Sequence, residues 1–383
     1  MERNLSVLRA MQLCQGCQFF LPVFYLFLRE NGLSWQQVFA VEATFTFAVM
    51  LCQLPAGLLA DRLGPKAVLI TGYMAGACGL AIQANASEYE WFLTGHALLG
   101  LFIACHAAGL EAMTYGTLLS LGREGEFRQT IGRLVGWALG ALAVSGLLGG
   151  LVAIFSLRLT IWFTWPMFLV GAALAFQLRS PPNGTPSSPD DAADDVTPSS
   201  LWSIGAVMLV NITLITATAA LAWLAQPYQA AIGLPEWCIG VVQAFSLLLA
   251  ASAAHWTHYL EEYVDDRVLL VGTATVIALS FAGLAFVGGI VGVVLIVIGR
   301  GCFGVVATIG SDLLHRLIAH ESRSRTQAIQ GAAMRGTMAV SSLAIGTMIE
   351  GGNVAQALTA SFVVVAGAMT VTLGYLTVAW PGD

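Results

Sequence analysis

The sequence predicts an all-α polytopic membrane protein, with twelve transmembrane helices arranged as two pseudo-symmetric six-helix bundles. Of its 383 residues, 57% are hydrophobic and only 10% are charged, with a mean hydropathy of +0.78. So few charges cannot cover a soluble core of this size, because soluble domains carry roughly 25% charged residues. Apolar runs of about 20 residues, enough to cross a bilayer as a helix, follow one another along the chain. A polar linker divides these runs into two sets.

The apolar runs are continuous rather than alternating, so they predict helices and not a membrane barrel. We place the spans at residues 5–28, 38–60, 67–86, 92–118, 129–153, 157–178, 201–225, 237–259, 267–286, 290–315, 328–350 and 357–379. Residues 179–200, rich in Pro and Asp, cannot bury apolar area and are expected to form a flexible linker. The expected domains are therefore an N-terminal bundle over 1–178 and a C-terminal bundle over 201–383.

The distribution of Lys and Arg predicts the orientation. With a cytoplasmic N-terminus, the outer side holds only Arg29 and Arg158, and Arg300 lies within a span, while the other Lys and Arg lie inside. Both termini and the linker are then cytoplasmic. The net charge of -6 offers no basic surface for nucleic acid. The expected partners are the lipid bilayer and a small-molecule substrate, with the chain acting as a monomer.

Residues 57–69 read GLLADRLGPKAVL, between the second and third spans. This segment resembles the loop signature of the major facilitator superfamily, G-x-L-A-D-R-x-G-R-K-x-x-L, with Pro65 replacing the first residue of the Arg-Lys pair. The resemblance implies a latch that holds the two halves together in the outward-facing state. A plain positive-inside turn is the simpler interpretation. The motif residues assigned to gating are Gly57, Asp61, Arg62, Gly64 and Lys66.

The two glycines of the motif have expected structural roles. Gly57 would allow two helices to approach closely, and Gly64 would allow a tight turn. Asp312 and Arg335 lie toward the cytoplasmic ends of their helices and form a candidate structural or gating pair. Asp61 could compete for Arg335 when the halves close.

Ionisable side chains within spans are costly and often functional. Glu111 is the first candidate proton carrier, because desolvation favours the protonated form of a carboxyl group. Tyr115 follows one turn later and could hydrogen-bond it; a structural hydrogen bond to a neighbouring helix is the rival interpretation. His96 and Glu42 are further proton-coupling candidates, with packing and interfacial placement as their respective alternatives.

Helical spacing places some of these groups together. His96 and Glu111 are about 60° apart around their helix, so they would share one face. Arg300 and His315 have the same spacing in the second half. By resemblance, spans 1, 4, 7 and 10 line the central path. The candidate cavity and substrate residues are Gln15, Gln18, Tyr25, Tyr115, Asn211, Thr218, Trp223, Arg300 and His315.

We expect a secondary active transporter that works by alternating access in a bacterial-type inner membrane. Residues 145–150, SGLLGG, resemble the G-P-x-x-G-G helix of family antiporters without its proline. This favours proton-coupled export by antiport of a small organic or amphipathic molecule. Proton-coupled nutrient uptake by symport is the alternative, and a non-transporting membrane sensor is a third. The sequence lacks H-E-x-x-H, G-x-S-x-G and G-x-x-x-x-G-K-[ST] patterns, so we expect no enzyme, no metal and no cofactor, only a proton gradient.

Overall fold

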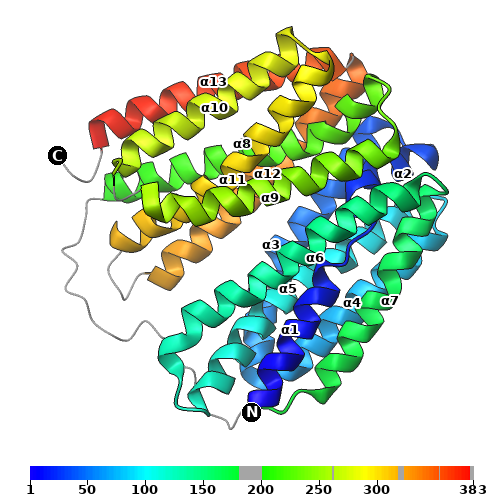
Figure 1. Cartoon of the computed structure of the whole chain (residues 1–383), viewed down its shortest axis with the longest axis vertical. Helices are drawn as coiled ribbons and strands as arrows, with labels where there is room; N and C mark the ends of the chain where they lie inside the picture. The colour runs from blue at the N-terminus through cyan, green and yellow to red at the C-terminus, as the bar shows by residue number, and fades with distance from the viewer. Residues whose placement is uncertain (181–200, 261–262, 318–322, 353, 380–383) are drawn as a thin grey trace. The chain divides into compact units, whose positions relative to one another are not determined.

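A computed structural model describes residues 1–180, 201–260, 263–317, 323–352 and 354–379. The regular structure in these ranges is helical (Figure 1). Nearly all of the predicted linker, 179–200, lies outside the described residues. The first half contains α1 (Glu2–Gly16), α2 (Phe24–Glu30), α3 (Trp35–Leu63), α4 (Pro65–Asn85), α5 (Tyr89–Leu119), α6 (Phe127–Ala153) and α7 (Leu157–Gln177), with the 3-10 turns η1 (Leu21–Val23) and η2 (Glu124–Glu126).

The second half contains six helices. They are α8 (Leu201–Ala231), α9 (Glu236–Leu260), α10 (Asp266–Phe286), α11 (Gly289–Leu317), α12 (Arg323–Gly351) and α13 (Val354–Ala379). Within the described ranges, 11 stretches are long and apolar enough to cross a membrane, and α13 adds a shorter apolar stretch over Val354–Thr370. The helical, multi-pass architecture predicted from the sequence is therefore confirmed.

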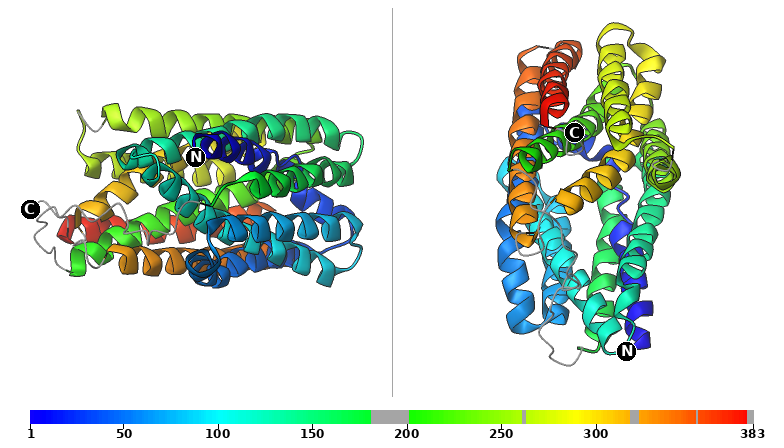
Figure 2. Two further views of the ribbon diagram at one scale, coloured as in Figure 1. Left: turned by 90° about the horizontal axis from the view of Figure 1, so that it is seen from below. Right: turned by 90° about the vertical axis from the view of Figure 1, so that its left-hand side faces the viewer.

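The chain divides into two compact units. Unit 1 comprises residues 1–33, 40–191 and 236–244, and unit 2 comprises residues 34–39, 192–235 and 245–383. In unit 1, α4 packs along both α5 and α7 (Figure 2). Small residues make this packing close: a Cβ on Gly79 would lie 2.6 Å from the Gly95 carbonyl oxygen, and one on Gly171 would overlap the Tyr73 ring.

The loop between α3 and α4 differs in one respect from the sequence interpretation. Gly64 has φ +85°, as its expected role in the turn requires, and it N-caps α4. Gly57, however, has no atom within 4 Å of an added Cβ, so it does not mediate the expected close approach. Ala56 and Ala60 form the close contact instead, because they face the core while Gly57 is turned away.

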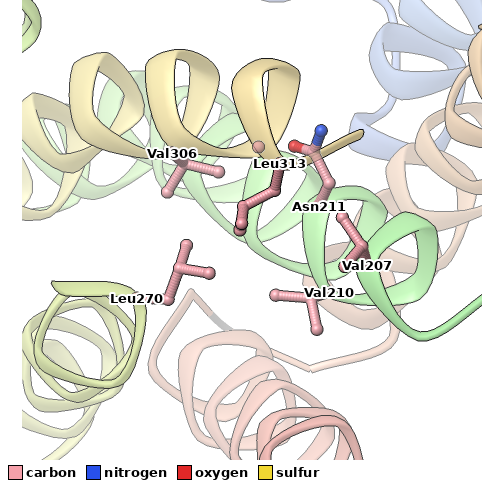
Figure 3. A pocket seen from close by; sticks show the side chains of 7 residues that line it. Val207, Val210, Asn211, Leu270, Val306 and Leu313 are labelled. Carbon is pink, nitrogen blue, oxygen red and sulfur yellow. The ribbon is translucent and has the colours of Figure 1, made fainter. Parts of the chain in front are cut away.

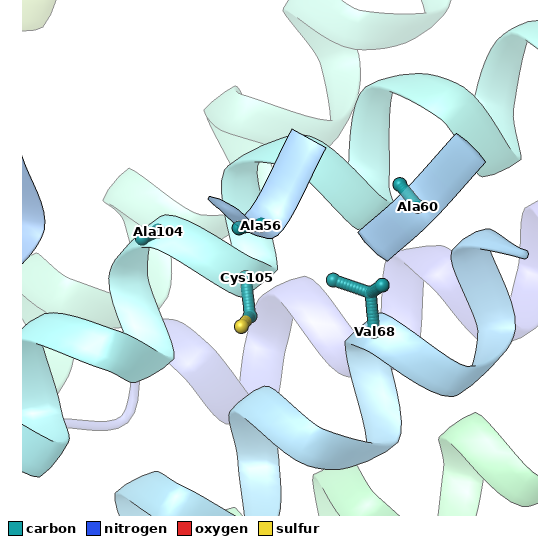
Figure 4. Packing of buried hydrophobic residues seen from close by; sticks show 5 residues of the cluster. All are labelled: Ala56, Ala60, Val68, Ala104 and Cys105. Carbon is teal, nitrogen blue, oxygen red and sulfur yellow. The ribbon is translucent and has the colours of Figure 1, made fainter. Parts of the chain in front are cut away.

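The core at this loop joins three helices. Ala56 and Ala60 of α3 pack with Val68 of α4 and with Ala104 and Cys105 of α5 (Figure 4). The tight α3–α4 turn is thus anchored on α5, the helix that carries most of the ionisable candidates in unit 1.

Candidate functional site

The first membrane span is broken near its middle. The sequence predicts one continuous span over 5–28, whereas α1 ends at Gly16 and helix resumes only at Leu21. Figure 1 shows the ribbon of α1 passing through an irregular stretch before α2. Such a break frees backbone N–H and C=O groups, which must find partners inside protein because lipid offers none.

Hydroxyl groups of two neighbouring helices provide these partners. Ser145 Oγ of α6 donates to the Gly16 carbonyl at 2.9 Å and accepts from the Gln18 N–H at 3.1 Å. Thr164 Oγ1 of α7 accepts from the Phe19 N–H at 3.0 Å. Ser145 is only 1% exposed, so these bonds are shielded from solvent.

A glycine makes room for the same break. An added Cβ on Gly149 of α6 would overlap the Phe19 carbonyl oxygen, so a larger residue cannot stand there without displacing the backbone. Ser145 and Gly149 belong to the SGLLGG segment that resembles an antiporter helix. In this structure, that segment holds the broken part of the first span.

The break presents polar side chains at mid-span. Gln15 and Gln18 are both half-buried, and Gln18 Nε2 donates to the Gln15 carbonyl at 2.9 Å. Discontinuous helices commonly form substrate sites in transporters, because their exposed backbone and polar groups can contact a ligand. The two glutamines remain candidate substrate residues. Tyr25, in contrast, is 5% exposed and packs beside Phe24 at 6.3 Å between ring centroids.

A second cluster surrounds His96 of α5. Its Nδ1 lies 2.9 Å from Nε2 of Gln83 on α4, and its Nε2 lies 3.8 Å from Oε2 of Glu42 on α3. The Phe24 ring stacks on the imidazole with a centroid distance of 4.7 Å and an interplanar angle of 7°. We call Phe24, Glu42, Gln83 and His96 the His96 cluster. The structure therefore brings together two of the three proton-coupling candidates.

The His96 cluster can accommodate both charge states of the ring. With neutral His96, Gln83 Nε2 donates to an unprotonated Nδ1, and the ring proton on Nε2 faces Glu42. Gln83 Oε1 is buried and has no hydrogen-bond partner. Rotation of the amide by a half-turn would let Oε1 accept from a protonated Nδ1. The carboxylate of Glu42 then faces the added positive charge.

His106, a further ionisable group of α5, is held by α1. Its Nε2 donates to Gln12 Oε1 at 2.6 Å, while Nδ1 is buried without a hydrogen-bond partner. Phe102 stacks on the ring at 5.4 Å, and Tyr73 meets it edge-on at 5.6 Å. This geometry ties α1, α4 and α5 together through one polar contact inside an aromatic core.

Glu111 lies apart from both histidines. His96 is 5% exposed and directed into unit 1, whereas Glu111 is on an exposed side of α5. The expected shared face is therefore not observed, because the offset around the helix is enough to place one group in the core and the other outside it. Glu111 forms no hydrogen bond or ion pair with the described residues. Tyr115 does not bond it and instead meets Phe127 edge-on at 5.6 Å.

The gating residues of the α3–α4 loop have two kinds of environment. Asp61 and Arg62 are exposed, without a hydrogen bond or ion pair to the described residues. Lys66 Nζ donates to the Phe176 carbonyl at 2.8 Å. That contact places a positive charge at the C-terminal end of α7, where the helix dipole favours it.

In unit 2, Asn211 of α8 lies in a narrow apolar pocket. Val207, Val210, Leu270, Val306 and Leu313 line this space with Asn211 (Figure 3). A Cβ on Gly310 would come within 2.6 Å of the amide, and Asn211 Oδ1 is buried without a partner. Asn211 is thus packed against α11 and does not face a wide cavity.

The other candidates of unit 2 lie on α8, α11 and α12. Thr218 Oγ1 donates to the Ile215 carbonyl at 2.8 Å, and Trp223 is 6% exposed in the core. Arg300, Asp312 and Arg335 are half-buried. The side chain of His315 lies outside the described residues, so its expected position with Arg300 is not assessed. Among described residues, no group of three or more His, Cys, Asp or Glu side chains could hold a metal ion.

Sequence reasoning missed Gln83, Ser145 and Thr164. Each is polar within a predicted span, and that is a usable signal. Their partners come from other helices, however, so spacing along one helix could not pair them.

The fold and these membrane-buried polar sites define a polytopic helical transporter. The family model of the Major Facilitator Superfamily matches residues 10–343, and the chain belongs to this family. Membership places it among transporters of small molecules rather than enzymes. The loop resemblance seen in the sequence is thereby confirmed at the level of the superfamily.

Solved structures share the fold at low sequence identity. A mutant of the nucleoside transporter NupG matches with a TM-score of 0.78 and 13% identity, over 98% of this chain and 99% of that one. A POT family transporter in complex with 5-aminolevulinic acid matches with a TM-score of 0.76 and 9% identity, over 99% and 97%. The Mus musculus protein named "Putative transporter SVOPL" is 31% identical over 81 residues, which are 21% of this chain and 16% of that protein's length.

Proposed function

We propose that this protein is a proton-coupled exporter of a small organic or amphipathic molecule. It works by alternating access in a bacterial-type inner membrane, with both termini cytoplasmic. The observation that carries proton coupling is the His96 cluster, in which a buried imidazole lies 3.8 Å from the Glu42 carboxylate. A histidine beside a carboxylate within a membrane span is a candidate for binding and releasing a proton during the cycle.

Two further features support the proposal. Glu111 supplies a second proton-coupling carboxyl group on α5, and Gln15 and Gln18 at the helix break supply polar contacts for a substrate. Export rather than uptake is favoured by the SGLLGG segment, which resembles the family's antiporter helix. Asp61, Arg62 and Lys66, with Asp312 and Arg335, are the proposed gating residues.

Transport direction can be tested with purified protein in liposomes. A potassium–valinomycin clamp removes the membrane potential, so that only an imposed pH gradient drives movement. Antiport predicts that ethidium accumulates in acid-inside vesicles as protons leave. Uridine is the matched probe for the uptake alternative, and its accumulation from an acid exterior, without ethidium movement, would establish symport instead. Absence of any response to the pH gradient for either probe would refute proton coupling.

The His96 cluster is tested in the same assay. His96→Gln keeps a polar side chain but cannot titrate, so we expect gradient-driven accumulation to fall at least about tenfold while exchange without a gradient persists. Glu42→Gln should weaken gradient-driven accumulation in the same direction. His255→Gln is the matched control, because His255 is exposed on α9 and its ring lies beside those of Trp256 and Tyr259. Full coupling in His96→Gln would remove the cluster from the mechanism.

A further inference from the structure

Unit 2 contains a half-open cavity of about 200 Å³ between three helices. α8 contributes Thr213, Thr216, Ala217 and Ala220, which recur at helical spacing and so form one stripe. α12 and α13 contribute similar stripes. The space exists because several of these positions carry alanine, where a larger side chain would fill it.

Every helix around the cavity contributes at least one hydroxyl group. The hydroxyl-bearing lining residues are Thr213, Thr216, Thr337, Ser341 and Ser361. The remaining lining residues are apolar, and none of the residues that line the cavity is ionisable. No opposite charge lines the cavity to compensate an ion for the hydration it loses there, which disfavours charged ligands.

The hydroxyl groups of this cavity are mostly unpartnered. Thr337 Oγ1 donates to the Ala333 carbonyl at 2.9 Å, but the other four hydroxyl groups form no hydrogen bond with the described residues. Thr216 is 8% exposed, and its Oγ1 is buried without a hydrogen-bond partner. An unpaired hydroxyl in an apolar environment is destabilising, because it has lost its hydrogen bonds to water.

Hydroxyl groups without a hydrogen-bond partner are unusual in the described part of unit 2. Hydroxyl groups in membrane helices usually bond to a carbonyl one turn earlier. Thr273, Thr275 and Ser280 of α10 all do so, at 2.7, 2.8 and 2.9 Å. The cavity hydroxyl groups instead keep their hydrogen-bonding capacity available to a molecule inside the cavity.

We propose that this cavity binds an uncharged, mostly apolar molecule with one or two hydroxyl or carbonyl groups. An apolar cavity of about 150 Å³ accommodates benzene, so this one suits a single substituted ring. The apolar wall contacts the ring, and the hydroxyl groups of Thr213, Ser341 and Ser361 bond the polar substituent. The proposal concerns binding within unit 2 and does not depend on proton coupling or on the direction of transport.

The test uses a photoreactive benzyl alcohol carrying a trifluoromethyl-diazirine group, with the full-length protein in liposomes. After irradiation, labelled peptides are quantified by mass spectrometry. We expect labelling concentrated in peptides of α8, α12 and α13 and displaced by excess benzyl alcohol. The matching benzoate should label these peptides at least about tenfold less, because its charge must be desolvated. Equal labelling by the benzoate, or labelling spread evenly over the helices, would overturn the proposal.

Two variants and a control locate the site. Ala344→Phe fills the cavity and should reduce labelling about tenfold, while Ser361→Ala removes a hydroxyl group that lines it and should reduce labelling about threefold. Thr275→Val removes a hydroxyl of the same unit that already bonds Val271, and should change nothing. Thermal unfolding verifies that each variant is folded. If Ala344→Phe fails to fold, Ser361→Ala decides: labelling unchanged from the native protein would refute the site.

Discussion

His96 shows how both ring nitrogens of a histidine in a membrane helix can face polar side chains. Gln83 bonds one ring nitrogen, Glu42 faces the other, and Phe24 fixes the plane of the ring. His106 differs, because its second nitrogen is buried without a partner and no carboxylate faces the ring in the described structure. A proton added to His106 would be far less compensated. The surroundings, not the residue type, therefore single out His96.

Glu111 gives a second prediction that concerns a single residue. Its side chain forms no hydrogen bond or ion pair with described residues, so Glu111→Gln should change the unfolding free energy by less than about 0.5 kcal/mol. Gradient-driven transport should nevertheless fall strongly, because an amide cannot take up and release a proton. Thermal unfolding and pH-driven flux measure these two quantities separately.

The matched control for Glu111 lies in the first turn of the same helix. Glu90→Gln changes a carboxylate in the first turn of α5 and should leave coupled flux intact. Full gradient-driven flux in Glu111→Gln would assign coupling to the His96 cluster alone. A large loss of stability would instead reveal a structural contact for Glu111.

At the scale of helices, the break in the first span illustrates what sequence patterns cannot specify. Residues 5–28 are apolar enough to predict a span, although Gly16 ends α1 and Pro22 lies in the turn where helix resumes. The break is stabilised by Ser145 and Thr164 from other helices, and local propensity carries no information about such partners. In contrast, the turn at Gly64 was predictable, because a positive φ favours glycine and the sequence has glycine there.

Two glycines of α6 test the packing of this break. Gly149→Ala would place a Cβ against the Phe19 carbonyl oxygen, so we expect destabilisation of about 1–3 kcal/mol. Gly140→Ala changes the same residue type on the same helix, where nothing lies within 4 Å. It should be neutral or stabilising by about 0.5–1 kcal/mol, because alanine favours helix. Chemical unfolding in detergent compares the stabilities of the two variants. Equal stabilities would show that the backbone at Phe19 shifts to accommodate the added Cβ.

For the whole molecule, the sequence was sufficient to predict class and span positions, because each span must be long and apolar regardless of its neighbours. The contacts of the candidate site were harder to predict from the sequence. Glu42 and His96 were candidates individually, but their contact joins α3 to α5, and the predicted face shared by His96 and Glu111 did not occur. The spacing of residues along a helix predicts which of them share a face, but it does not predict which other helix packs against that face.

The orientation of the molecule in the membrane yields the last prediction. Positive charges concentrate on the side of the α3–α4 loop, so position 190 should be cytoplasmic and Glu88, which precedes α5, should lie outside. The test begins from a variant in which all 7 native cysteines are replaced, since some are accessible. A single cysteine is then introduced as Asp190→Cys or Glu88→Cys. A membrane-impermeant maleimide added to intact cells should label the second variant and miss the first, and permeabilised cells should allow both to react. Ready labelling at 190 from outside would invert the assigned topology, and with it the side from which the proposed exporter takes its substrate.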